Sequence, residues 1–233
     1  MKYRKFGYKT QTCWPEDDKV LHIEKRTDLC TVLGPGRRSV LWVKGCPFRC
    51  PGCVSPELWP FEGGTTESVK DLSRELIALP YIKGVTFSGG EPMMQALALC
   101  ALIDRIKSKS ELSFVCYTGF TLEEIIADGT SAQKALLERL DMLIDGPYLQ
   151  ARHTNLKWRG SDNQCIHFLT DRYLNLKSTL SERGNWVEFE FTDDGRFHWM
   201  GIPPLGFRRS FLKELQILGV GPLKGGSLNE RIT

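Results

Sequence analysis

The chain has 233 residues, of which 41% are hydrophobic and 25% charged, and its formal net charge is +3. This length suits one large domain or one domain with an extension, and the small charge argues against nucleic acid as a partner. We expect no secretory signal and no membrane partner, because no run approaches the roughly 20 apolar residues that cross a bilayer. The eight cysteines indicate a reducing compartment, with the cytoplasm as the default.

The first half of the chain predicts strands before and after a tight turn. In chain order we expect an irregular polar arm over 1–19, a short strand over 20–23, a turn at Gly34-Pro35-Gly36 and a strand over Val40–Lys44. Thr66 is the expected N-cap of the next helix, which Pro80 ends.

Strands and helices then alternate, which predicts an α/β fold with a parallel sheet covered by helices. The predicted strands are 84–88, 112–117, 142–144 and 166–169, and the predicted helices are 94–107, 122–127 and 132–140. The remainder predicts a β-hairpin, since strands over 186–191 and 196–200 flank an Asp-Gly turn within 192–195. A short helix over 211–218 and a frayed tail over 221–233 complete the chain.

Three cysteines in the run GCPFRCPGC are the most informative feature of the chain. Cys46, Cys50 and Cys53 form a C-x3-C-x2-C pattern in one loop, and no nearby residue supplies a fourth soft ligand. Cysteine thiolates are the usual ligands of iron–sulfur clusters, so this pattern predicts a 4Fe–4S cluster with one iron left open to a substrate or cofactor.

The three thiols have three alternative uses. A structural zinc site needs four N or S ligands, usually as two close pairs, and stays open as an alternative on ligand spacing alone. Disulfides suit small secreted frameworks, whereas a chain of this length can bury a core without them. An electron-carrying ferredoxin would close its cluster with four cysteines.

Four unusual loop sequences follow the four predicted parallel strands. They are the cysteine loop, SGGEP at 88–92, YTGF at 117–120 and DGPY at 145–148. Because ligands collect outside the carboxyl ends of parallel strands, we expect these loops to meet at one edge. Within SGGEP, Gly89 and Gly90 permit close backbone approach, and the Glu91 carboxylate suits an ammonium group.

Together, the cysteine pattern and SGGEP resemble the radical S-adenosylmethionine (SAM) superfamily. This resemblance implies a partial (β/α)6 barrel, with the hairpin as a C-terminal extension, and a single 4Fe–4S cluster that binds SAM. It implies that Ser88, Gly89, Gly90 and Glu91 contact the methionine part of SAM. Reductive cleavage would yield a 5′-deoxyadenosyl radical that abstracts a substrate hydrogen, with the electron coming from an external flavodoxin or ferredoxin.

Further motifs resemble the activating proteins of anaerobic ribonucleotide reductase, over roughly 33–170. They are the GPG turn, the loops YTGF and DGPY, and WRGSDNQ at 158–164. By this likeness Thr118 and Asp145 line the SAM or cation side of the pocket, and turn capping is an equal alternative for both. The residues that would border the same pocket are Arg159, Asn163 and Gln164.

Departures from the activating pattern favour a different substrate. Val54-Ser55-Pro56 follows the third cysteine where an aromatic residue and Asn are usual, and Leu33 stands where an acidic residue commonly precedes GPG. With the hairpin extension, these features resemble small radical SAM enzymes that mature ribosomally made peptides, including backbone splicing at tyrosine. Our first hypothesis is therefore peptide maturation, with glycyl-radical activation and a non-catalytic iron–sulfur or zinc module as alternatives.

Both enzymatic hypotheses predict a polypeptide substrate and a groove that reaches the cluster, lined by Trp59, Phe61 and Tyr148. A separate small protein could supply leader-peptide recognition. Cys100 and Cys116 are predicted to be buried free thiols, whereas no role is predicted for the thiols Cys13, Cys30 and Cys165. We divide the chain into an N-terminal arm over 1–33, a radical SAM barrel over 34–173 and a packed extension over 174–233.

Overall fold

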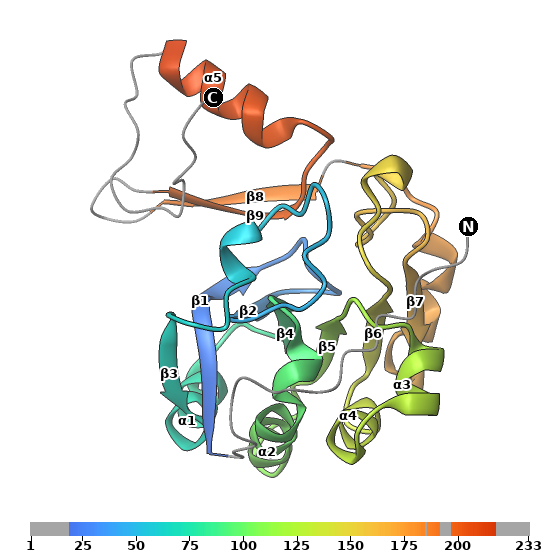
Figure 1. Ribbon diagram of the computed structural model, residues 1–233. Helices are drawn as coiled ribbons and strands as arrows, with labels where there is room; N and C mark the ends of the chain where they lie inside the picture. Colours follow the sequence, from blue (N-terminus) through green and yellow to red (C-terminus); the bar gives the residue numbers. More distant parts are fainter. Residues whose placement is uncertain (1–18, 185, 192–196, 218–233) are drawn as a thin grey trace.

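The computed structural model describes residues 19–184, 186–191 and 197–217, and seven of its strands form one sheet (Figure 1). In spatial order the strands are β3 Thr65–Ser68, β1 Val20–Cys30, β2 Arg38–Val43, β4 Gly84–Gly89, β5 Ser113–Tyr117, β6 Met142–Asp145 and β7 Cys165–Phe168. Strands β2, β4, β5 and β6 pair in parallel, which confirms the α/β class. Strands β1, β3 and β7 are antiparallel to their neighbours, so the sheet is mixed.

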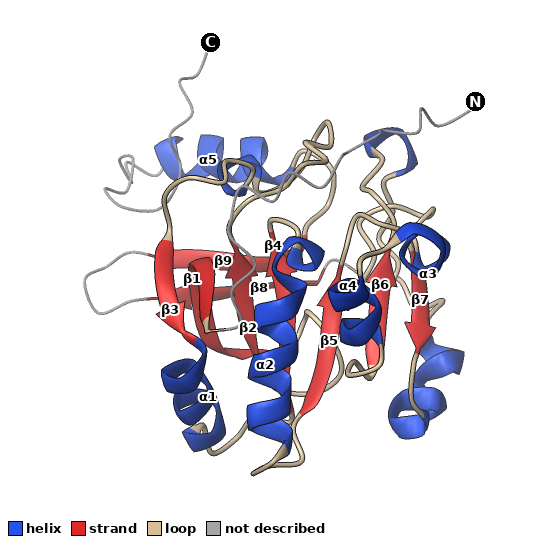
Figure 2. Ribbon diagram, turned by 60° about the horizontal axis from the view of Figure 1, so that its bottom comes forward, coloured by secondary structure: helices blue, strands red, loops and turns tan. Residues whose placement is uncertain are grey.

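Helices cover one face of this sheet (Figure 2). The helices are α1 Val69–Ala78, α2 Ala96–Lys107, α3 Leu122–Asp128 and α4 Ser131–Leu137. Leu72 of α1, Leu99 of α2 and Leu136 of α4 are buried in the same apolar cluster as strand residues such as Leu41. Val40, the neighbour of Leu41, belongs to a separate cluster. Successive strand residues point to opposite faces, so both faces of the sheet are packed.

The opposite face is covered by a hairpin and by the segment that follows β6. Strands β8 Trp186–Phe191 and β9 Phe197–Ile202 form the hairpin, and α5 Phe207–Ile217 follows it. Met200 is 3% exposed and packs against Val32 and Val40. Farther along the sheet, Trp158 covers Val115 in another apolar cluster. The hairpin is thus an integral part of the packing.

Polar contacts fix the hairpin to β1 and to the residue that follows it. The Glu188 carboxylate accepts a hydrogen bond from the Thr31 amide at 2.8 Å. The Glu190 carboxylate accepts one from the Thr27 hydroxyl at 3.1 Å. Because Thr27 is 2% exposed, this second bond gives a buried hydroxyl a hydrogen-bond acceptor.

The prediction that Thr66 caps a helix is wrong. Residues Thr65–Ser68 form strand β3, and Thr66 pairs with His22 of β1. The N-cap of α1 is Ser68, whose side chain accepts a hydrogen bond from the Asp71 amide. A Thr-rich segment suits a strand as well as a cap, and the long-range pairing with β1 decided between the two.

Other elements differ from the prediction at their ends. Strand β1 runs to Cys30, well beyond the predicted 20–23, because its polar second half pairs with β2. A 3-10 segment, Pro92–Gln95, precedes α2, which begins at Ala96. Helix α5 begins earlier than predicted, at Phe207. The predicted N-terminal arm (apart from Lys19), the Asp-Gly turn and the C-terminal tail lie outside the described residues.

Within the described chain, the sheet is open, with β3 and β7 at its edges. Barrel closure therefore stays a prediction. None of the described helices combines the length and the apolar character that crossing a bilayer would require.

A buried arginine ties together the N-terminal ends of the parallel strands. Arg38, at the start of β2, is 0% exposed. Its guanidinium donates hydrogen bonds to the Thr86 hydroxyl at 2.7 Å, to the Val85 carbonyl at 2.8 Å and to the Ser113 carbonyl at 2.9 Å. Because Arg38 binds groups on β4 and β5, one side chain fixes the relative position of three strands.

Replacing Arg38 with alanine should lower the free energy of unfolding by about 4 kcal/mol, because several buried acceptors lose their donor. Denaturant unfolding of cluster-free protein measures this change. Arg37→Ala is the matched control, since the Arg37 guanidinium lies over the exposed Tyr81 ring, 5.9 Å from its centroid. The control should cost no more than about 1 kcal/mol. Equal losses in the two variants would contradict the role of the buried guanidinium.

Candidate functional site

The cysteine loop follows β2 and is closed by backbone hydrogen bonds. The Gly45 amide donates to the Leu58 carbonyl at 2.9 Å, and the Cys46 amide donates to the Trp59 carbonyl at 3.0 Å. Gly45 has a positive φ of 85°, and the Phe61 ring packs where a side chain at position 45 would lie. The loop therefore folds back on its own start.

All three loop cysteines are half-buried free thiols. Burial raises the pKa of each thiol, and that of Cys46 rises to about 12. The Ser55 amide donates a hydrogen bond to the Cys53 sulfur at 3.4 Å. Since iron binds thiolates, cluster assembly here has to release protons. Three thiols on one closed loop fit the donor chemistry of an iron–sulfur cluster.

The SGGEP turn is hydrogen-bonded to the start of the cysteine loop. The Gly90 amide donates to the Val43 carbonyl at 2.7 Å, and the Glu91 amide donates to the Gly45 carbonyl at 2.8 Å. A Cβ on Gly90 would lie 2.4 Å from the Gly45 carbonyl oxygen. The two glycines thus permit the close approach that the sequence predicts, although the partner is protein backbone.

Gly89→Ala should disrupt this junction. Gly89 has a φ of +100°, and a Cβ there would lie 2.6 Å from Trp42 Cα. We expect a loss of about 3 kcal/mol or more in unfolding free energy, together with loss of SAM binding. Gly206→Ala is the control, because Gly206 shares a positive φ of +78° but has nothing within 4 Å. The control should cost about 1–2 kcal/mol and leave SAM binding intact. A Gly89→Ala protein that binds SAM normally would contradict the expected role of the SGGEP turn in SAM binding.

Glu91 lies at the centre of the site and is 1% exposed. Its carboxylate accepts hydrogen bonds from the Met93 amide at 2.9 Å, the Thr118 hydroxyl at 2.8 Å and the Gly119 amide at 2.7 Å. Burial raises its pKa to about 7, although these three hydrogen bonds act to lower it. A carboxylate has about four acceptor positions, so Glu91 retains capacity for a cationic partner.

The YTGF loop is joined to the cysteine loop by aromatic packing. The rings of Phe48 and Phe120 meet edge to face, with 4.8 Å between centroids. A Cβ on Gly119 would lie 2.6 Å from the Phe48 ring. Thr118 is 5% exposed, and besides donating to Glu91 it accepts a hydrogen bond from the Phe120 amide at 3.1 Å. The bond from the Phe120 amide corresponds to the capping alternative for Thr118, and its pocket-lining role stays a prediction.

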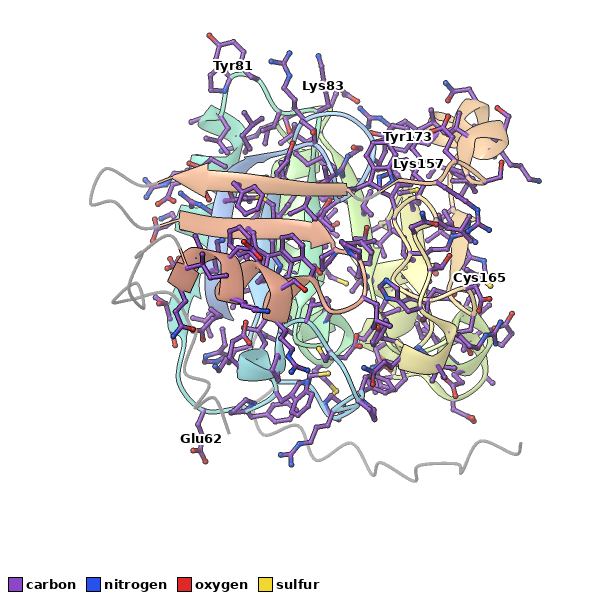
Figure 3. All side chains as sticks on the ribbon, turned by 90° about the horizontal axis from the view of Figure 1, so that it is seen from above. Glu62, Tyr81, Lys83, Lys157, Cys165 and Tyr173 are labelled. Carbon is purple, nitrogen blue, oxygen red and sulfur yellow. The ribbon has the colours of Figure 1, made fainter. Side chains whose placement is uncertain are left out.

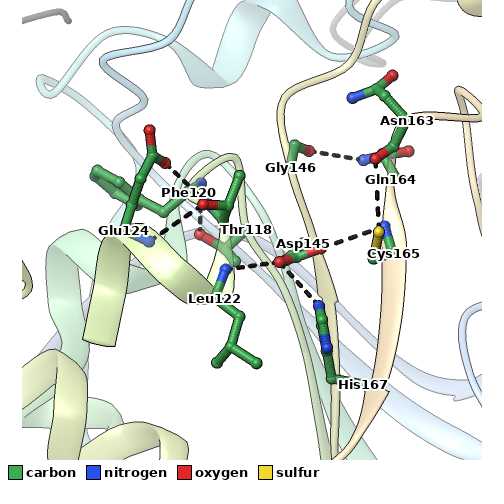
Figure 4. A network of polar contacts seen from close by, with 11 residues as sticks. Thr118, Phe120, Leu122, Glu124, Asp145, Gly146, Asn163, Gln164, Cys165 and His167 are labelled. Atoms are coloured by element: carbon green, nitrogen blue, oxygen red, sulfur yellow. Dashed lines mark hydrogen bonds and ion pairs between the residues drawn. The ribbon is translucent and has the colours of Figure 1, made fainter. Parts of the chain in front are cut away.

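Asp145 lies at the end of β6 and joins the DGPY loop to its neighbours (Figure 4). Its carboxylate accepts hydrogen bonds from the Leu122 amide at 2.6 Å and the Cys165 amide at 3.2 Å. His167 approaches it at 3.0 Å. Burial acts to raise the pKa of Asp145, but the contacts with His167 and the two amides outweigh burial and lower it. This geometry corresponds to the capping alternative.

The WRGSDNQ segment packs behind the DGPY loop. The Asn163 side chain donates to the Pro147 carbonyl at 2.8 Å, and the Gln164 side chain donates to the Gly146 carbonyl at 3.0 Å. The Arg159 guanidinium donates to the Leu180 carbonyl at 2.6 Å. The Nε nitrogen of Arg159 is buried without a hydrogen-bond partner among the described residues, so this side chain retains a free donor.

The four strand-end loops therefore meet at one edge, as the sequence predicts. Glu91 joins SGGEP to YTGF, Phe48 joins YTGF to the cysteine loop, and the Gly146 amide donates to the Phe120 carbonyl at 3.0 Å. The sequence did not predict that Phe48 joins two of the loops. Its position as an aromatic residue between Cys46 and Cys50 was the signal that could have indicated this role.

The predicted groove residues border the cysteine loop. Trp59 and Phe61 contribute to its closure, and the Tyr148 hydroxyl lies 3.0 Å from the His153 ring nitrogen. All three side chains are half-buried, and the groove itself stays a prediction. A cavity of about 550 Å³ lies elsewhere, beside Lys83, Lys157 and Tyr173, which Figure 3 labels. Lys83 precedes β4, so this cavity lies toward the edge opposite the cysteine loop.

The other described cysteines lie outside the cysteine loop. Cys100 and Cys116 are buried, as predicted, and Cys30 is also buried. Cys165 is exposed on β7, and Cys13 lies outside the described residues.

Comparison with known proteins identifies relatives for most of the sheet. The chain matches the 4Fe-4S single cluster domain family over residues 32–167. It is 36% identical over 147 residues to the anaerobic ribonucleoside-triphosphate reductase-activating protein of Vibrio cholerae, covering 60% of this chain and 92% of that protein. The protein of the same name from Enterobacteria phage T4 is 35% identical over 146 residues, covering 60% of this chain and 89% of that protein.

A more distant match involves a second kind of activating enzyme. The pyruvate formate-lyase-activating enzyme of Clostridium pasteurianum is 33% identical over 101 residues, covering 40% of this chain and 42% of that enzyme. The family match includes the cysteine loop, SGGEP, YTGF and DGPY, and it ends within β7. The hairpin and α5 follow the matched region.

Proposed function

The chain belongs to the 4Fe-4S single cluster domain family, as a radical SAM protein of the activating type, and on this premise we propose that it installs a glycyl radical on a partner enzyme. The matched relatives are named for activating anaerobic ribonucleoside-triphosphate reductase or pyruvate formate-lyase. These names favour the activating alternative over peptide maturation, which none of them supports. A partner of the first class is our first candidate substrate.

The observation that carries the proposal is that the SGGEP turn, which holds the buried Glu91, is hydrogen-bonded to the start of the loop that carries the three half-buried cysteines. The cofactors of the family are a 4Fe–4S cluster and SAM. We assign Cys46, Cys50 and Cys53 as cluster ligands, because thiolates are the donors such clusters take. When bound, the reduced cluster supplies the electron that splits SAM into methionine and a 5′-deoxyadenosyl radical.

Within the chain, we assign the SGGEP turn to SAM binding. Ser88, Gly89 and Gly90 present backbone close to the cysteine loop, and the Glu91 carboxylate would pair with the ammonium group of SAM. Thr118 would hold Glu91 in place through its 2.8 Å hydrogen bond. Arg159, whose Nε–H has no hydrogen-bond partner among the described residues, would be a further contact in the SAM pocket.

Asp145 would act as a positioning residue under this proposal. Its bonds to Leu122 and Cys165 hold the start of α3 and the start of β7 against the end of β6.

In the proposed hydrogen transfer, a Cα–H bond of a glycine in the partner would break. Its hydrogen would go to the 5′-deoxyadenosyl radical to form 5′-deoxyadenosine, and the unpaired electron would remain on the glycine. The chain's own part is to bind, orient and shield the reactants.

We extend the proposal to architecture and cellular context. Residues 34–173 would form the partial (β/α)6 barrel, and 174–233 would be a packed extension. Residues 1–33 would be an N-terminal arm and short strand, and this part of the chain contributes β1 to the same sheet. The protein would work in the cytoplasm with an external flavodoxin or ferredoxin as electron donor.

Anaerobic incubation with SAM, a reductant and an anaerobic ribonucleoside-triphosphate reductase tests the proposal. The expected result is release of 5′-deoxyadenosine together with a stable glycyl radical in the electron paramagnetic resonance spectrum of the partner. Release of 5′-deoxyadenosine with a mass change in a small peptide, and no glycyl radical, would favour peptide maturation. Absence of SAM cleavage in cluster-loaded, reduced protein would leave a non-catalytic cluster module.

A further inference from the structure

Three side chains of the kinds that bind zinc meet where β6 ends beside β7. Asp145 pairs with Cys165 in the strand register, and His167 lies two residues farther along β7, on the same face as Cys165. The nearest ligand atoms of these residues, one oxygen, one sulfur and one nitrogen, all lie within 4.8 Å of one another. Figure 4 shows the three side chains gathered beside the start of α3.

The carboxylate of this group is already oriented. Asp145 is 3% exposed, and each of its two oxygens accepts a backbone hydrogen bond, from the Leu122 amide and the Cys165 amide. Hydrogen bonds of this kind characteristically fix carboxylates that ligate metals, and both oxygens keep a further lone pair.

The imidazole of His167 supplies the nitrogen donor of the group. Its Nε2 is a buried atom that lies 3.0 Å from an Asp145 oxygen, and Figure 4 draws this contact. A metal ion between the two side chains would replace the contact and take the imidazole and the carboxylate as ligands.

Cys165 supplies the sulfur ligand of the group and exposes it to solvent. Its side chain is exposed, and its sulfur makes one weak contact, 3.8 Å from the Asn163 carbonyl. Figure 3 shows the residue at the rim of the molecule, away from the hairpin. An ion could therefore enter from solvent and meet a thiol that is not engaged in the cysteine loop.

We propose that Asp145, Cys165 and His167 form a zinc site with three protein ligands and a fourth position open to water or to a ligand from outside the chain. Thiolate, imidazole and carboxylate are the donors that zinc takes, and a thiolate disfavours magnesium and calcium. The ion would link the end of β6 to β7. It would sit behind the DGPY loop.

Zinc titration of anaerobic, cluster-loaded full-length protein tests the site. After treatment with a chelator mild enough to leave iron content unchanged, the protein should bind about one zinc ion per chain, measured by competition with a chromophoric chelator. Cobalt as a spectroscopic substitute should add a thiolate-to-metal charge-transfer band. The iron content should remain constant throughout the titration.

Two ligand variants and one control assign the ion to its residues. Cys165→Ser and His167→Gln should each weaken zinc binding by more than about tenfold, since even the loss of a supporting contact costs that much. The cobalt band should disappear in Cys165→Ser. Cys100→Ala, which removes a thiol buried in α2, should leave both readouts unchanged.

Two results would overturn the zinc site. One is no zinc uptake by the wild-type protein, which would leave Asp145 and His167 as an ion pair only. The other is zinc binding that survives in Cys165→Ser and His167→Gln but disappears when Cys46, Cys50 and Cys53 are all replaced by alanine. Because the readout is metal binding, the zinc site and the radical chemistry can fail separately.

Discussion

Replacing Cys46, Cys50 or Cys53 with alanine should abolish both cluster retention and SAM cleavage. Each thiolate would hold one iron of the cluster, and the loop that carries all three is closed by the Gly45 and Cys46 backbone hydrogen bonds, so its fold does not depend on any one thiol. Iron and sulfide content after anaerobic reconstitution measures retention, and 5′-deoxyadenosine release measures cleavage. We expect iron at background and no detectable product in each single variant.

Cys100→Ala provides the matched control for these three variants. Cys100 is a buried thiol on α2, and its sulfur makes one weak contact with the Ala132 carbonyl at 3.7 Å. Its replacement should leave iron content and SAM cleavage at the wild-type level. The ligand assignment would be incorrect if Cys100→Ala lost its iron while any loop variant kept a full cluster.

Glu91→Gln should weaken SAM binding by roughly 10- to 100-fold at pH 8, because the neutral amide cannot pair with the ammonium group of SAM. Burial raises the pKa of Glu91 to about 7, against the hydrogen bonds from Gly119, Met93 and Thr118. Wild-type affinity should therefore fall as the pH drops below 7, toward about tenfold per unit. Glu91→Gln should lack this pH dependence, which equilibrium binding at several pH values measures.

The raised pKa of Glu91 also predicts that the stability of cluster-free protein depends on pH, in the direction opposite to that of SAM binding. A raised pKa means that the folded state binds the proton more tightly than the unfolded state. Its contribution to stability is fully present below the unfolded pKa, near 4.3, and is lost as the pH rises through about 7. Glu138→Gln, at an exposed carboxylate after α4, should change neither profile. A flat wild-type binding profile between pH 6 and 8 would contradict this account of Glu91.

The sequence was sufficient to predict the four parallel strands and the edge at which the four loops meet. Apolar runs such as Val40–Val43 have a local pattern, and the rule that ligands gather at strand ends places SGGEP beside the cysteines. Strands β1 and β3 were less predictable, because the polar half of β1 becomes a strand by pairing with β2, and the segment Thr65–Ser68 becomes one by pairing with the start of β1.

Within the site, the types of residue were predictable but their partners were not. Glu91 was predicted to meet an ammonium group, and the structure adds that Thr118 and Gly119 bind the same carboxylate. The chain separation from Glu91 to Gly119 leaves no local signal for that contact. For Asp145 the partners are the informative part, because its contacts with the Leu122 and Cys165 amides are those of the capping alternative rather than of a pocket-lining residue.

The hairpin restricts the directions from which a large protein can dock. Met200 and Glu190 close the non-helical face over Val32, Val40 and Thr27, so this chain itself already occupies that side of the sheet. Helices occupy the other side. Under the proposed function, a glycine that is to be oxidised would approach end-on, and the partner would present it on a protruding, extended segment rather than on a flat surface.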